Sequence, residues 1–273
     1  MGSRMSRSER VAYMTARLVS NPSRLFGLGD FARELGVARS TVSEDLALIR
    51  SALAQGAGGI HTLPGAAGGV VYTPRPSSEH LEMIRNELVS ELRSPARVLP
   101  GGFLYMTDLI FSPRWAEAFG AYFANLFEPC APDAVVTIET KGIPLALMTA
   151  RGLGKPLVII RRNSRVTEGS SVSINYVSGS SSRIQTMSLP RRALEPRGKV
   201  VVVDDFLRGG GTASGSRDLL AEFDVEVLGT AVVASTEQPR EKLVQDYVSL
   251  VEIRQNDDGA IEVVSSAPGL PVS

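Results

Sequence analysis

The residues best suited to chemistry lie in one run at residues 200–212, which reads VVVVDDFLRGGGT. Its glycines at 209–211 allow backbone N–H groups to converge on a phosphate, and a helix beginning near Thr212 would add its partial positive charge. Two adjacent carboxylates, Asp204 and Asp205, cannot bind phosphate, but they suit vicinal hydroxyls, with or without a metal ion. A phosphate cradle beside a diol-binding acid pair predicts a ribose 5-phosphate site.

This run differs from two other phosphate-binding motifs. A Walker-type P-loop needs Gly-Lys-Thr after its glycines, and the lysine is missing here. A dinucleotide-binding fingerprint lacks the acid pair before its glycines. The remaining alternative is a glycine-rich turn capped by the two aspartates, with no ligand.

The site requires a scaffold, and the surrounding sequence predicts a parallel sheet. Continuous apolar strands at 134–139, 157–160, 199–203 and 225–234 alternate with helices expected at 113–127, 143–152 and 212–223. This alternation is typical of an α/β domain whose parallel sheet is covered on both faces. Ligands of such sheets bind at the carboxyl ends of the strands. Polar segments follow two of these strands at 139–144 and 161–165, so they are expected beside the acid pair.

The N-terminal part has a different pattern. Apolar residues at helical spacing predict helices at 8–20, 28–35 and 39–53. Gly36 ends the second helix, and the second and third helices joined by this tight turn have the helix-turn-helix pattern. The glycine-rich segment at 56–72 predicts a β-hairpin, or wing. Its alternative is a three-helix packing module without a DNA role. The carboxylates of Glu44 and Asp45 must cap the helix, pair with arginine or face away from DNA. The expected DNA contacts lie at the start of the third helix and on the hairpin, and they are Arg39, Ser40, Thr41, Ser43 and His61.

Charge and composition set further bounds. Residues 1–75 hold nine arginines against five acidic residues, a surplus of four positive charges that the rest of the chain balances to zero. No run approaches the length of a membrane helix, and one cysteine, Cys130, excludes an intrachain disulfide framework or a cysteine-based zinc site. We therefore expect a cytoplasmic protein with no membrane partner. The Pro/Ser-rich linker at 73–78 predicts an α+β winged-helix domain at 1–75 and an α/β domain at 76–273, opened by an amphipathic helix at 79–94.

The run at 200–212 resembles the phosphoribosyl-pyrophosphate (PRPP) motif of type I phosphoribosyltransferases. Residues 139–144 are similar to their pyrophosphate loop, Arg161 and Arg162 to their basic residues after the next strand, and residues 165–185 to their flexible loop. With the winged helix and the segment SINYVSGSS, the chain from Ser6 to about Val264 resembles the Gram-positive purine operon repressors.

That resemblance implies a homodimer, associated through its phosphoribosyltransferase-like domains, which binds inverted repeats in double-stranded operator DNA. PRPP would be the inducer, ppGpp a competing ligand, and Mg²⁺ a possible companion of PRPP. For a guanine base, Phe206 and Tyr105 are candidate partners, with core packing as the alternative for Tyr105. The predicted effector-binding residues are Tyr105, Thr140, Lys141, Gly142, Arg161, Arg162, Asp204, Asp205, Phe206, Leu207, Arg208, Gly209, Gly210, Gly211 and Thr212.

Two departures from the enzyme pattern favour a sensor. Some purine phosphoribosyltransferases place an aspartate three residues after the acid pair, and Arg208, which cannot accept a proton, stands there. The next position, usually threonine or serine, is Gly209. The sequence therefore predicts a repressor without catalytic or resident metal-ligating residues. The alternative is an active purine phosphoribosyltransferase with an accessory N-terminal domain.

Overall fold

A computed structural model describes residues 5–56, 58–65, 68–100, 103–163, 169–177, 184–256 and 260–266. The chain forms two compact units. The first comprises Met1–Leu81 with Arg151–Gly154, and the second comprises Glu82–Ala150 with Lys155–Ser273. The unit boundary thus falls inside a helix, close after the linker expected at 73–78.

The N-terminal unit contains the three predicted helices, α1 (Arg7–Val19), α2 (Leu28–Leu35) and α3 (Arg39–Leu53). Helix α1 begins with a capping box in which Ser6 and Glu9 bond each other's backbone N–H groups. Helix α2 ends at Gly36, whose φ of +65° is a left-handed conformation that glycine adopts without steric cost. The helix-turn-helix prediction is confirmed. Its core is apolar, with Met14, Leu18, Phe31, Val42, Leu46 and Ile49 all nearly inaccessible.

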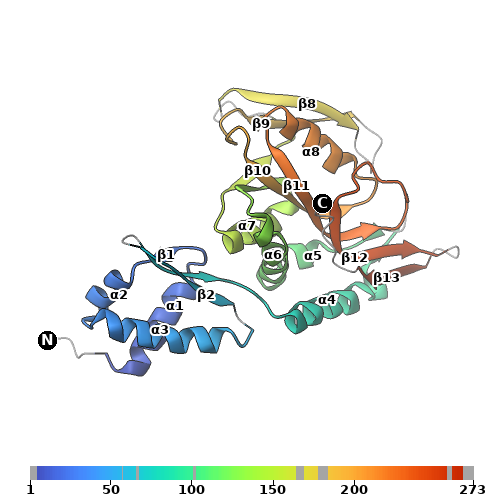
Figure 1. Ribbon diagram of the computed structural model, residues 1–273. Coiled ribbons are helices and arrows are strands. Elements are labelled where there is room, and N and C mark those ends of the chain that lie inside the picture. The colour runs from blue at the N-terminus through green and yellow to red at the C-terminus, as the bar shows by residue number, and fades with distance from the viewer. Residues whose placement is uncertain are drawn as a thin grey trace. The chain divides into compact units, whose positions relative to one another are not determined.

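A three-stranded antiparallel sheet completes this unit, in the order β1 (Leu25–Phe26), β3 (Gly69–Thr73) and β2 (Gly59–Leu63). The β2–β3 pair is the predicted hairpin, and Figure 1 shows it beside the three helices. Strand β1 was not predicted because two residues carry no periodic pattern. A helix-turn-helix followed by this hairpin is a winged-helix arrangement.

Asp45 pairs with arginine, which was one of the three roles left open for it. Its side chain is fully buried although it lies on α3. Arg7 Nε and Arg10 Nε of α1 donate to its two oxygens at 3.1 and 2.9 Å. Two of the nine N-terminal arginines therefore hold α1 against α3. A buried charge needs such partners.

The second unit is built on a six-stranded sheet with the order β13-β12-β11-β10-β6-β7. All neighbours are parallel except β12 and β13. The α/β parallel-sheet prediction is confirmed, and two C-terminal strands are added to it. The strands are β6 (Ala134–Ile138), β7 (Leu157–Ile160), β10 (Lys199–Leu207), β11 (Glu226–Thr236), β12 (Tyr247–Gln255) and β13 (Ile261–Ser265).

Helices cover both faces of this sheet. Leu219, Leu220 and Phe223, at the end of α8 (Gly211–Ala221) and just after it, pack on one face. On α6 (Pro113–Phe127), the ring of Phe127 lies against Gly229 of β11. Gly120 of α6 lets that helix approach α7 (Gly142–Leu153) closely, because a Cβ there would lie 2.2 Å from Met148 Cβ. The remaining elements are α4 (Ser78–Leu92), η1 (Pro95–Arg97), β4 (Val98–Leu99), β5 (Phe103–Leu104), α5 (Thr107–Ile110) and η2 (Glu128–Cys130).

The prediction of a flexible loop at 165–185 is wrong for residues 171–177. Residues Ser171–Val177 form strand β8, which pairs antiparallel along its length with β9 (Ile184–Pro190). Tyr176 of β8 packs against Gly215 of α8, and Figure 1 shows the hairpin over that helix. Alternate apolar residues of β8 gain burial there, which stabilises a strand over a loop. Residues 164–168 and 178–183 lie outside the described part of the chain.

Candidate functional site

The acid pair and the glycine turn lie at the carboxyl end of β10. This strand is four residues longer than predicted, so Asp204 and Asp205 lie within it rather than after it. The Asp205 N–H donates to Asp204 Oδ1 at 2.9 Å. Gly210 precedes α8 with φ +80°, and a Cβ there would lie 3.2 Å from the backbone nitrogens of Leu243 and Val244. Only glycine satisfies both demands.

Electrostatics single out the two aspartates. Burial and the neighbouring Asp205 charge raise the pKa of Asp204 well above its ordinary value. Burial likewise raises the pKa of Asp205. The positive charge of Arg162 lowers the pKa of Asp204 and that of Lys141 lowers the pKa of Asp205, so both cations lie near the pair. Ionisation of these buried carboxylates is unfavourable without a partner. A ligand that offers hydroxyl donors or positive charge would stabilise their ionised form.

The turn after β6 packs directly against the acid pair. A Cβ at Gly142, the first residue of α7, would lie 2.2 Å from Thr137 Oγ1 and 2.7 Å from Asp204 Oδ1. The peptide bond between Glu139 and Thr140 in this turn is cis. Thr140 and Lys141 are exposed. The structure therefore brings together two segments that the sequence only placed at the same edge of a sheet.

Glu139 connects this turn to the end of β7. The backbone N–H of Arg162 donates to Glu139 Oε1 at 2.7 Å, and Arg161 Nη1 lies 3.8 Å from Glu139 Oε2. Arg161 also exchanges two backbone hydrogen bonds with Ser188 of β9, at 3.0 and 2.7 Å. Both predicted arginines thus border the site. The organising role of Glu139 was missed, because a carboxylate in a turn carries no specific signal.

A buried lysine, Lys242, forms hydrogen bonds to backbone carbonyls in and near the glycine turn. Lys242 Nζ donates to the carbonyls of Arg208 and Pro239 at 2.9 and 2.8 Å, and the Leu243 N–H donates to the Gly209 carbonyl at 3.0 Å. Lys242 is 8% exposed, and burial lowers the pKa of its ammonium group. These bonds anchor the carbonyls of Arg208 and Gly209 to Lys242 and Leu243.

The remaining predicted effector residues differ in exposure. Leu207 is buried in an apolar cluster with Ala213, Val232 and Val244, so only its backbone could meet a ligand. Tyr105 is 44% exposed, which argues against the core-packing alternative. Phe206 is partly buried on β10 and Gly211 is buried at the start of α8, with Thr212 partly buried after it.

Arg208 lies beside an aromatic residue that the sequence did not single out. Its guanidinium carbon is 5.9 Å from the ring centroid of Phe103 on β5, a cation–π distance. Phe103 is 51% exposed. An isolated phenylalanine far away in the sequence gave no signal of this contact.

The predicted DNA contacts lie on the surface of the winged helix. Arg39, Ser40 and Ser43 are exposed in the first turns of α3, and His61 is exposed on β2. Thr41 is partly buried, and the Ser43 hydroxyl donates to the Arg39 carbonyl at 3.1 Å.

Two arginines shape this surface. The Arg39 guanidinium lies against Gly29 of α2, where a Cβ would be 2.8 Å from Nη2. Arg50, which the sequence did not single out, joins α3 to the hairpin. Its Nε donates to the Ile60 carbonyl at 3.2 Å and its Nη2 to Thr62 Oγ1 at 2.8 Å.

The described residues contain no group of three or more His, Cys, Asp or Glu side chains placed to hold a metal ion. None of the helices described is long and apolar enough to cross a membrane.

Comparison with known proteins separates the same two parts. Residues 6–74 match the family described as "Bacterial purine repressor, N-terminal", and residues 112–268 match the phosphoribosyl transferase domain family. An adenine phosphoribosyltransferase structure from Thermoanaerobacter pseudethanolicus covers 61% of this chain and 98% of its own, with a TM-score of 0.53 and 21% identity. That likeness shows the fold of the second unit alone.

Relatives that align with most of this chain are named as transcriptional regulators. The purine biosynthesis transcriptional repressor PurR of Bacillus subtilis is 43% identical, over 90% of this chain and 87% of its own length. The purine biosynthesis transcriptional activator PurR of Lactococcus lactis is 38% identical, over 93% and 94%. A xanthine phosphoribosyltransferase of Deinococcus deserti is 34% identical over 66% of this chain. The chain belongs to the PurR family of DNA-binding transcriptional regulators, as the resemblance of its motifs predicted.

Proposed function

We propose that this protein represses purine biosynthesis genes and releases its operator when PRPP binds at the carboxyl end of β10. The observation that carries the proposal is the convergence of three chemistries at one site. Asp204 and Asp205 supply diol acceptors, the glycine turn supplies backbone N–H groups, and Lys141 and Arg162 supply positive charge.

Each part of PRPP has a partner in this arrangement. The ribose hydroxyls would donate to the acid pair, and the 5-phosphate would accept from the turn at 209–212 and the N-terminus of α8. The pyrophosphate would meet Lys141, Arg161 and Arg162. Mg²⁺ fits the same carboxylate oxygens and would neutralise phosphate charge beside them. The alarmone ppGpp, a competing anion, would use the phosphate contacts and stack its base on Tyr105 or Phe206.

Release of DNA requires a difference in affinity. PRPP can weaken operator binding only if it binds the DNA-free protein more tightly, by about 1.4 kcal/mol for each tenfold change. We propose that Arg39, Ser40, Thr41, Ser43 and His61 contact the operator and that the protein acts as a homodimer. Light scattering of the purified protein tests the dimer.

Substitution of the acid pair tests the effector site. Asp204→Ala with Asp205→Ala should abolish PRPP binding in calorimetry and the PRPP response in an electrophoretic shift assay, while operator binding is retained. Undiminished release of operator by PRPP would exclude this site.

An active purine phosphoribosyltransferase is the second candidate, because relatives named xanthine phosphoribosyltransferases align with this domain. Against it stands Arg208, whose guanidinium lies beside Phe103 and cannot accept a proton from a purine. The assay is purine-dependent release of pyrophosphate from PRPP. Turnover at ordinary enzyme rates would replace the sensor proposal.

A further inference from the structure

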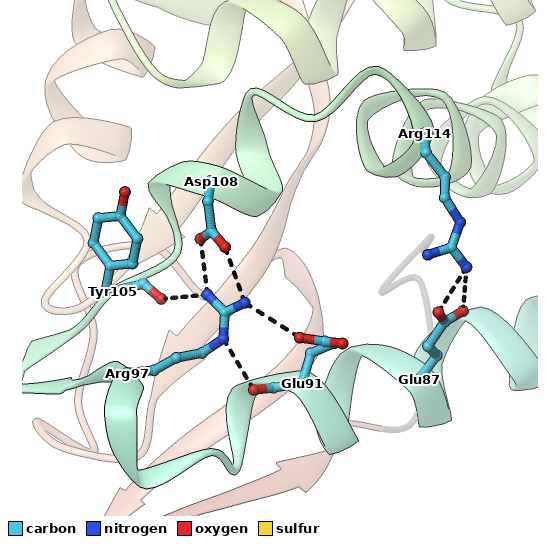
Figure 2. Close-up of polar contacts among 6 residues, drawn as sticks. All are labelled: Glu87, Glu91, Arg97, Tyr105, Asp108 and Arg114. Carbon is cyan, nitrogen blue, oxygen red and sulfur yellow. Dashed lines mark hydrogen bonds and ion pairs between the residues drawn. The ribbon is translucent and has the colours of Figure 1, made fainter.

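Arg97 uses all five of its guanidinium N–H groups within the protein. Nε donates to the Glu91 carbonyl at 3.0 Å, and Nη2 donates to Glu91 Oε2 at 3.2 Å. Asp108 accepts two bonds, from Nη1 at 2.8 Å and from Nη2 at 3.0 Å, and the Tyr105 carbonyl accepts the fifth at 3.1 Å. Figure 2 shows these groups around one guanidinium. The side chain is only 13% exposed, so the arginine is saturated and largely buried.

These contacts join three elements. Glu91 lies in the last turn of α4, Asp108 lies in α5, and Tyr105 directly follows β5. The Tyr105 N–H also donates to the Arg97 carbonyl at 2.8 Å, so backbone and side chain together close the base of the short β4–β5 hairpin. The Arg97 contacts hold the pKa of Asp108 below its ordinary value, mainly through the hydrogen bonds. The hairpin is thereby fixed to α4.

The same hairpin reaches the glycine turn. Phe103, the first residue of β5, lies beside the Arg208 guanidinium. Contacts in the described structure therefore lead from Arg208 through Phe103 and Tyr105 to Arg97 and α4. Helix α4 is also the element that follows the winged helix along the chain, after residues 74–77.

We infer that Arg97 is a positioning residue that transmits occupancy of the glycine turn to α4. This inference rests on the proposed effector function. A bound phosphate attracts Arg208 away from the Phe103 ring, because a phosphate is a stronger partner than a half-exposed aromatic face. The hairpin then loses one contact and shifts. Because Arg97 bonds to both the hairpin and α4, the movement of the hairpin is transmitted to α4.

A second ion pair supplies a matched control. Arg114 of α6 donates through Nη2 to both oxygens of Glu87 on α4, at 2.6 and 2.7 Å, and Figure 2 shows it apart from the Arg97 cluster. Its side chain is 67% exposed. None of its contacts in the described structure is with the hairpin or the glycine turn. Arg114→Met therefore removes an arginine that holds α4 without interrupting the contacts to Arg208.

The experiment measures operator affinity by fluorescence anisotropy with and without saturating PRPP, and PRPP affinity of the DNA-free protein by calorimetry. In the unsubstituted protein and in Arg114→Met we expect PRPP to weaken operator binding by about tenfold or more. In Arg97→Met the factor should fall below about twofold, with PRPP and PRPP-free operator affinities each within about threefold of the unsubstituted values. A full PRPP response in Arg97→Met would overturn the inference, as would an equal loss in Arg114→Met.

A milder variant covers the case in which Arg97→Met does not fold. Asp108→Asn keeps one acceptor for the guanidinium but removes the charge, so the PRPP response should be intermediate. An unchanged response in Asp108→Asn would also overturn the inference. Failure of the proposed function looks different, because PRPP would then leave operator binding of the unsubstituted protein unaffected.

Discussion

Lys242→Met should weaken binding of a 5-phosphate selectively. The ammonium group forms hydrogen bonds of 2.9 and 2.8 Å to the carbonyls of Arg208 and Pro239, and the substitution removes both while keeping most of the side-chain volume. Hydrogen bonds to charged groups contribute about 1.5–3 kcal/mol each. Because burial disfavours the Lys242 charge and lowers its pKa, we take the lower bound, about 3 kcal/mol for the two bonds.

We expect this free energy to hold the turn at 208–211 in its observed conformation, in which its N–H groups would bind the 5-phosphate. If about half of these 3 kcal/mol stabilises the binding conformation of the turn, its loss lowers the affinity for ribose 5-phosphate by about tenfold, since 1.4 kcal/mol corresponds to a factor of ten. Inorganic pyrophosphate, which would bind at Lys141, Arg161 and Arg162, should keep its affinity within about twofold.

Calorimetric titrations with the two anions measure this difference. Lys199→Met is the control, because it makes the same substitution at the amino end of β10, where Lys199 pairs with Glu226 at 3.7 Å on the surface. Lys242→Arg should restore part of the ribose 5-phosphate affinity. Equal losses for both anions, or none, would refute the assigned role of Lys242.

Three further predictions concern the acid pair, the glycine turn and the DNA-binding surface. Asp204→Asn should abolish PRPP binding yet raise the free energy of unfolding at pH 7 by about 1 kcal/mol. The raised pKa makes ionisation of Asp204 destabilising as pH rises above 3.8, so the gain should vanish in acid when thermal unfolding is compared at both pH values. Gly210→Ala should cost about 1–2 kcal/mol in denaturant unfolding because of its φ of +80°, whereas Gly209→Ala, whose Cβ would make an ordinary contact of 3.8 Å with Pro239 Cγ, should cost little. Arg39→Ala should weaken operator binding and reduce its salt slope by about one, and an unchanged slope would remove Arg39 from the interface.

Local patterns explain why much of the fold was predictable. The four-valine strand, the glycine at the end of α2 and the proline at the start of α6 each act within a few residues of themselves. Strands β12 and β13 were missed. They pair antiparallel at one edge of the sheet, and β12 changes from buried to exposed residues along its length, so neither resembles the buried parallel strands.

The candidate site divides in the same way. The aspartates, glycines and arginines are visible because each motif is contiguous in the sequence. Lys242 and Phe103 contact groups that are remote in the sequence, a carbonyl and a guanidinium. Arg97 contacts residues only 6, 8 and 11 positions away, but they lie in separate elements that no periodic pattern connects. No spacing rule connects a lysine to a carbonyl 34 residues away. Only the folded structure identifies such supporting residues.

The central claim is that PRPP at the glycine turn releases DNA from the winged helix. The most direct measurement is binding of an operator fragment with and without saturating PRPP, at two salt concentrations. We predict that PRPP weakens binding by about tenfold or more at either salt concentration, as a coupling between two sites requires. Operator affinity that is unchanged by saturating PRPP at both salt concentrations would contradict the claim.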